Sequence, residues 1–139
     1  MKGVNYRAVV IAVIASLGLD LVAAVTLAAF LGDVPSGPEV TKEQREVAVA
    51  ALIASQSYQL ASLVLGTLST IIGGYLAARM ARSLPYMNSF AFGLVGIVIS
   101  AISAGDMPLW FNIVGFTILL PAALFGGHLA KRAMNFPQP

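Results

Sequence analysis

One acidic residue lies inside an apolar segment, where a charge is costly. Residues 8–31 carry a single charged side chain, Asp20, close to the middle of the segment. At the centre of a bilayer an ionised carboxylate costs at least about 2.5–3.5 kcal/mol, so Asp20 is expected to face other helices and to stay protonated or find a partner. No Lys or Arg lies at the same depth. The available partners are hydroxyl groups: Ser16, Ser69, Thr70, Ser100 and Thr117.

Asp20 has two interpretations. In the first, Asp20, Ser16 and Thr70 form a candidate site for a proton or a small cation, because intramembrane acids commonly mark ion pathways. In the second, a protonated Asp20 only joins two helices through hydrogen bonds. The chain offers no second acid within an apolar segment that would decide between them.

Other residues with catalytic or ligand-binding chemistry are few. The chain has one histidine, His128, and no cysteine, which argues against a metal site. It contains no glycine-rich phosphate loop and no serine in a nucleophile elbow. Its basic residues are too sparse for nucleic-acid binding. We therefore expect no enzymatic activity, no cofactor, no metal and no nucleic-acid partner.

The elements that position Asp20 are long apolar segments. The chain is 58% hydrophobic and 10% charged, whereas soluble domains carry about 25% charged residues. Four segments approach or exceed the roughly 20 residues that cross a bilayer as a helix. They span residues 8–31, 60–78, 87–104 and 109–130. Residues 1–139 are thus predicted to form one all-α domain, a bundle of four transmembrane helices. The expected partner of its apolar surface is the lipid bilayer.

The charges separate into two groups along the chain. Six cations flank the predicted segments on one side: Lys2, Arg7, Arg79, Arg82, Lys131 and Arg132. The other side receives mostly acids: Asp33, Glu39, Lys42, Glu43, Arg45, Glu46 and Asp106. Lys and Arg accumulate in short cytoplasmic loops. This pattern predicts a multi-pass membrane protein with both termini in the cytoplasm.

The one sizeable loop, residues 32–55, is predicted to be extracytoplasmic and partly helical. Thr41 and Gln44 have the spacing of a capping box, so a helix should begin near Lys42. No Pro or Gly follows before the second segment, which favours one continuous helix into the membrane. The alternative is a helix on the membrane surface that turns near Ser55.

A short motif recurs at the ends of the second and fourth segments. Gly73-Gly74-Tyr75-Leu76-Ala77 and Gly126-Gly127-His128-Leu129-Ala130 share one register and both lead to cations. The repeat therefore predicts two similar helical hairpins. They arose either by duplication or by convergence on the same helix ending, in which small residues pack and cations reach the interface. In this register His128 takes the place of Tyr75, which favours an interfacial residue over a proton relay.

Small residues recur at every fourth position of the predicted helices, which lets helix backbones approach closely. The candidate packing glycines are Gly66, Gly73, Gly74, Gly93, Gly96, Gly126 and Gly127. They are expected to pack the bundle internally. Alternatively, one such face docks a second copy or another membrane protein.

The chain resembles uncharacterised small four-span proteins of the bacterial inner membrane, in which endings such as Gly73 to Arg79 are common. Its size, span count and Asp20 are also similar to those of small multidrug-resistance transporters, which exchange protons for cations around a first-helix acid. In those transporters the acid is a glutamate in a characteristic local sequence, which residues 18–21 do not match. Their loops are also shorter than residues 32–55 of this chain.

Two functions follow as expectations. The first is a non-enzymatic membrane protein that acts through helix–helix contacts, as an accessory subunit or self-associating scaffold. The second is a small proton- or ion-coupled transporter that uses Asp20.

Overall fold

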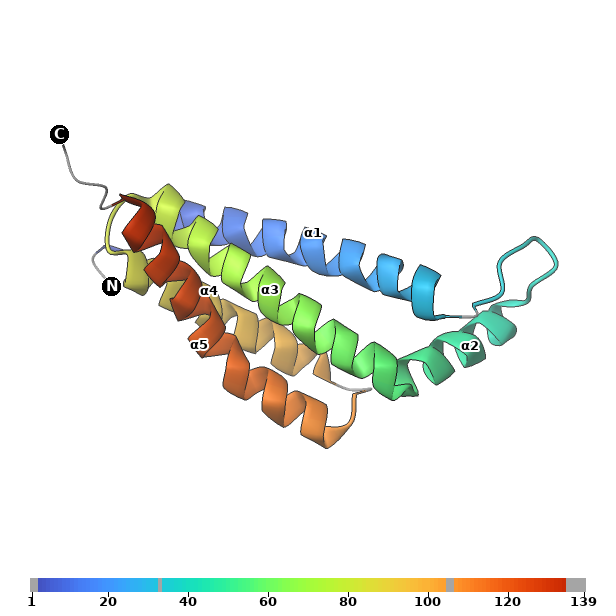
Figure 1. Ribbon diagram of the computed structural model, residues 1–139. Helices are drawn as coiled ribbons and strands as arrows, with labels where there is room; N and C mark the ends of the chain where they lie inside the picture. The colour runs from blue at the N-terminus through green and yellow to red at the C-terminus, as the bar shows by residue number, and fades with distance from the viewer. Residues whose placement is uncertain (1–2, 33, 105–106, 135–139) are drawn as a thin grey trace.

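The fold is an all-helical bundle (Figure 1). The computed structural model describes residues 3–32, 34–104 and 107–134, so Lys2, Asp33 and Asp106 of the charge pattern lie outside the described residues. The helices in this part of the chain are α1 (Tyr6–Leu31), α2 (Lys42–Ala54), α3 (Gln56–Ala81), α4 (Pro85–Ile102) and α5 (Leu109–Met134). All except α2 are long and apolar enough to cross a membrane, which confirms the predicted fold class.

Helix lengths match the thickness of a bilayer. The helices α1, α3 and α5 have 26 residues each and α4 has 18. At 1.5 Å per residue these lengths are about 39 Å and about 27 Å. The predicted segments fall inside the observed helices, except that α4 ends at Ile102 and not at residue 104. Ser103 leaves helical geometry there, while its N–H still bonds the Ile99 carbonyl.

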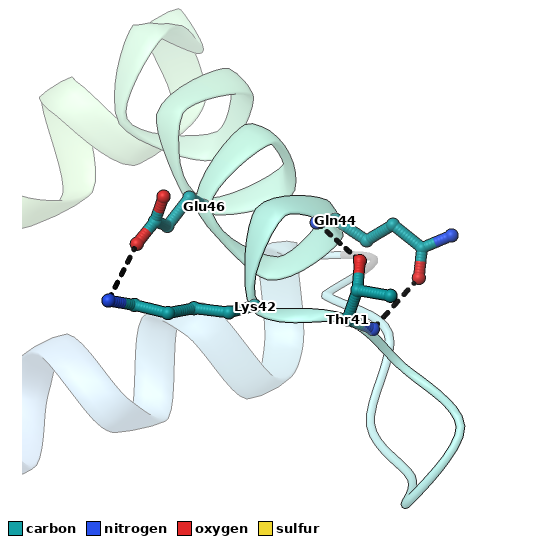
Figure 2. A network of polar contacts seen from close by, with 4 residues as sticks. All are labelled: Thr41, Lys42, Gln44 and Glu46. Carbon is teal, nitrogen blue, oxygen red and sulfur yellow. Dashed lines mark hydrogen bonds and ion pairs between the residues drawn. The ribbon is translucent and has the colours of Figure 1, made fainter.

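The capping box at the start of α2 is confirmed (Figure 2). The Thr41 hydroxyl accepts a bond from the Gln44 N–H at 3.2 Å, and the Gln44 side chain accepts one from the Thr41 N–H at 3.0 Å. Two N–H groups that the first helical turn leaves unpaired are thereby satisfied. Lys42, the first residue of α2, pairs with Glu46 one turn further along the helix, at 3.6 Å.

The expected continuous helix from residue 42 into the membrane is wrong, because the helix breaks at Ser55. This residue has extended backbone angles and ends α2 while it caps α3. Its hydroxyl donates to the Leu52 carbonyl at 2.7 Å and accepts from the Tyr58 N–H at 3.3 Å. Gln59 also donates its side-chain amide to the Ile53 carbonyl at 3.0 Å. A serine that serves both helix ends makes the break stable without Pro or Gly.

The helix α3 lies at the centre of the bundle and packs against α1, α4 and α5. At the end of the bundle where α1 begins and α5 ends, which we call the closed end, alanine and glycine are buried on all four long helices. They include Ala8, Ala12, Ala77, Ala78, Ala91, Ala123 and Ala130. At the opposite end, which we call the α2 end, fewer residues are buried, and α1 and α5 diverge toward it (Figure 1).

Candidate functional site

A cavity of about 270 Å³ lies between the four long helices on the α2 side of the bundle, and Asp20 is part of its wall. The other lining residues come from all four helices: Ala23, Ala24, Leu27, Tyr58, Ser62, Leu63, Gly66, Thr67, Thr70, Ser100, Phe111, Gly115, Ile118 and Leu119. Asp20 is the fifteenth of the 26 residues of α1, which places it near the middle of the helix. Asp20 is exposed, and the cavity that it lines is not fully enclosed.

The serine and threonine hydroxyls of α3 that line the cavity donate their protons to their own helix. Thr67 donates to the Leu63 carbonyl at 2.7 Å, and Thr70 donates to the Gly66 carbonyl at 2.8 Å. Ser62 likewise donates to the carbonyl of residue 59 at 3.0 Å. Each hydroxyl oxygen keeps a lone pair that can accept. The cavity wall therefore combines one carboxyl with several oxygen acceptors.

Ser16 ties α1 to α3 one turn of helix away from Asp20. Its hydroxyl lies 2.9 Å from the Ser69 hydroxyl, which also donates to the Ser16 carbonyl at 3.2 Å. Ser16 is buried and lines a second, smaller cavity of about 90 Å³. Asp20 and Thr70 line both cavities, so the three residues of the candidate site do meet in one region.

Charge in this region has one sign. Among the described residues that line the two cavities, none is Lys, Arg or His. The one ion pair in the described part of the chain, Lys42–Glu46, lies on α2, outside the long helices. An ionised Asp20 thus has hydroxyl neighbours but no counter-charge among these residues, which makes the site attractive to a proton or a cation.

Gly74 and Gly126 form the closest crossing of the bundle, between α3 and α5. A Cβ added at Gly126 would lie 2.7 Å from the Tyr75 nitrogen, and one added at Gly74 would lie 2.9 Å from the Ala123 Cα. Both distances are too short for real contacts with backbone atoms, so only glycine fits. The two helices touch backbone to backbone at this crossing.

The other candidate packing glycines divide into two groups. Gly73 faces the Phe92 ring, Gly127 faces Ser89, and Gly93 and Gly96 face residues of α5. Gly66 differs, since a Cβ built there meets no described atom within 4 Å. Gly66 lines the 270 Å³ cavity beside Asp20, where its missing side chain leaves space and no second helix contacts it.

His128 lies at the closed end and bonds the Tyr86 hydroxyl through Nδ1 at 2.9 Å. The Lys131 ammonium lies 5.3 Å from the centre of the same tyrosine ring. Both partners belong to the α4–α5 hairpin. Tyr75, the counterpart of His128 in the repeat, instead bonds Arg79 of its own helix. The two repeats therefore place these rings in different contacts.

Sequence reasoning missed two fully buried polar residues, Asn88 and Ser89. The Asn88 side chain accepts from the Asn5 N–H at 2.8 Å and donates to the Ser83 and Leu84 carbonyls. Ser89 donates to the Gly74 carbonyl at 2.8 Å. Two adjacent polar residues, Asn88 and Ser89, within an otherwise apolar segment could have indicated a buried polar contact. Asn88 fastens the start of α1 to the turn between α3 and α4.

No family model matches this sequence, and no match was found among the curated proteins or among the solved structures. The class follows from the fold alone: four long apolar helices make this chain an integral membrane protein.

Proposed function

We propose that this chain is a small proton- or ion-coupled transporter whose ion-binding residue is Asp20. The observation that supports the proposal is the position of this carboxyl on the wall of a cavity among four membrane-spanning helices. Intramembrane acids are expensive and are used mainly for ion and proton pathways. Thr70 and Ser100 line both cavities with Asp20 and supply further oxygen atoms.

The packing of the glycines favours this function over an accessory subunit or scaffold. That alternative depends on small-residue faces that are free to receive another helix. Six of the seven candidate glycines already face neighbours within the chain, and the seventh, Gly66, lines the cavity. The surface that is left is broad and aliphatic, as on Val10, Ile14 and Val25 of α1. Lipid tails cover such a surface without any partner.

We place the closed end in the cytoplasm and the α2 end outside it. The flanking cations that the structure describes lie at the closed end, where cytoplasmic loops prefer them: Arg7, Arg79, Arg82, Lys131 and Arg132. The resemblance to bacterial four-span proteins suggests the inner membrane. In this orientation Asp20 is reached from the outer side, and the alanine and glycine contacts of the closed end seal the path to the cytoplasm.

Flux measurements in proteoliposomes test the proposal. A pH-sensitive dye trapped inside reports proton movement under an imposed pH, sodium or potassium gradient. We expect flux with the natural protein and with Asp20→Glu, and loss of flux with Asp20→Asn. Gly18→Ala is the matched control, because it lies on the same helix in open space. Equal flux with Asp20→Asn, or no flux under any of these gradients, would refute the transporter.

A further inference from the structure

A groove runs along one face of α2, beside Gln59 of α3 and residues 107–108 before α5. It has a volume of about 970 Å³, at the upper end of the roughly 300–1,000 Å³ typical of small-molecule sites. Most of its lining residues recur at the helical spacing of three or four along α2. The full set is Lys42, Arg45, Glu46, Val49, Ala50, Ile53, Ala54, Gln59, Met107 and Pro108.

The character of this face changes from charged to apolar along the helix. Its first turns carry Lys42, Arg45 and Glu46, and its last turns carry Val49 and Ile53. The distance from the first residue of α2 to the last is about 18 Å at 1.5 Å per residue. The apolar end is the one joined through residue 55 to the membrane-spanning α3. Polarity therefore increases away from the membrane, as it does along a lipid molecule.

The charged part of the groove bears both signs and is available to a ligand. Lys42 and Glu46 pair at 3.6 Å, but their side chains are 92% and 67% exposed (Figure 2). Such an exposed pair contributes at most about 1 kcal/mol, so either charge can exchange its partner at little cost. Arg45 uses one N–H on the Gly37 carbonyl at 3.0 Å and has further donors to offer.

We propose that this groove binds a zwitterionic phospholipid from the membrane leaflet next to α2. Its phosphate would meet Lys42 and Arg45, and its ammonium group would meet Glu46. One acyl chain would lie along Val49 and Ile53 toward Met107. This assignment rests on the charge pattern and polarity gradient of α2 and is independent of any transport through Asp20.

Native mass spectrometry of the purified protein tests the site, with phosphatidylethanolamine or anionic phosphatidylglycerol added to the detergent. Ala50→Phe fills the groove, whereas Ala51→Phe adds the same ring at an exposed neighbour that does not line it. We expect at least a tenfold lower fraction of phosphatidylethanolamine adduct for Ala50→Phe and no change for Ala51→Phe. Because both alanines are exposed, both variants should unfold like the natural protein.

The headgroup assignment has its own variant. Glu46→Gln removes the group that would bind the ammonium, so the preference for phosphatidylethanolamine over phosphatidylglycerol should disappear. Equal adducts for Ala50→Phe and Ala51→Phe would overturn the groove as a lipid site. Equal retention of the two lipids by the natural protein would overturn a zwitterionic headgroup, and with it the proposal as stated.

Discussion

The crossing of α3 and α5 permits a sharp test of how the bundle is held together. In Gly126→Ala the new Cβ would lie 2.7 Å from the Tyr75 nitrogen, about 0.7 Å less than the 3.4 Å at which ordinary contact begins, and closer still to the Ile71 carbonyl oxygen. Backbone atoms cannot rotate away as side chains do, so the helices must separate. Overpacking of this kind costs about 1–3 kcal/mol.

The chain contains a matched control on the same helix. Gly115 also lies in α5, but a Cβ added there finds no described atom within 4 Å. Gly115→Ala should therefore be neutral or gain up to about 1 kcal/mol from helix propensity. Gly66→Ala and Gly74→Ala form the equivalent pair on α3, with Gly74→Ala the destabilising member.

Unfolding in mixed micelles, followed by circular dichroism as dodecyl sulfate is added, measures the difference. We expect Gly126→Ala to unfold at a clearly lower fraction of dodecyl sulfate than Gly115→Ala. Equal midpoints for the two variants would show that α3 and α5 do not touch backbone to backbone, and the reasoning about the closed end would fail.

Three further changes have defined outcomes. Asn88→Ala leaves the Asn5 N–H without its buried partner, so we expect about 1–3 kcal/mol lower stability in the same unfolding assay and faster hydrogen exchange at that amide. Ser55→Ala removes the cap of α3 and should cost about 1 kcal/mol; an unchanged midpoint would contradict this. Phe92→Ala empties a site that is 4% exposed and should cost about 3–5 kcal/mol, whereas the 52% exposed Phe125 should tolerate the same change in that assay.

Features set by local chemistry could be predicted from the sequence. The four long helices follow from runs of apolar residues, since lipid requires every backbone group to be bonded internally. The capping box follows from two residues, Thr41 and Gln44, that satisfy each other without help from the rest of the fold. The grouping of Asp20 with Ser16 and Thr70 was also anticipated from the few polar residues at that depth. Thr117, named with them, is exposed, lines neither cavity and donates to the Ile113 carbonyl.

Features that depend on the neighbouring helix could not be predicted. Gly66 and Gly74 lie on the same helix with the same spacing pattern, yet one borders a cavity and the other touches a backbone. The sequence does not say which face α5 will occupy. The break at Ser55 was only the alternative to a continuous helix, because no Pro or Gly marks it. The two bonds of the Ser55 hydroxyl, to Leu52 and Tyr58, are seen only in the folded chain. The role of Asn88 depends on two segments, at residues 5 and 83–84, that only the folded chain brings together.

The uneven packing of the bundle has a mechanical consequence. The contact between Gly74 and Gly126 is the tightest on α5 and lies near the closed end, so a tilt of the helix about this contact displaces its far end most. From Gly126 to Leu109 the lever arm is about 26 Å, counted at 1.5 Å per residue. A tilt of about 5° about this contact would move the far tip by about 2 Å, more than the roughly 1.4 Å radius of a water molecule. Because Phe111, Gly115 and Ile118 of α5 line the cavity beside Asp20, such a tilt would change the width of that cavity.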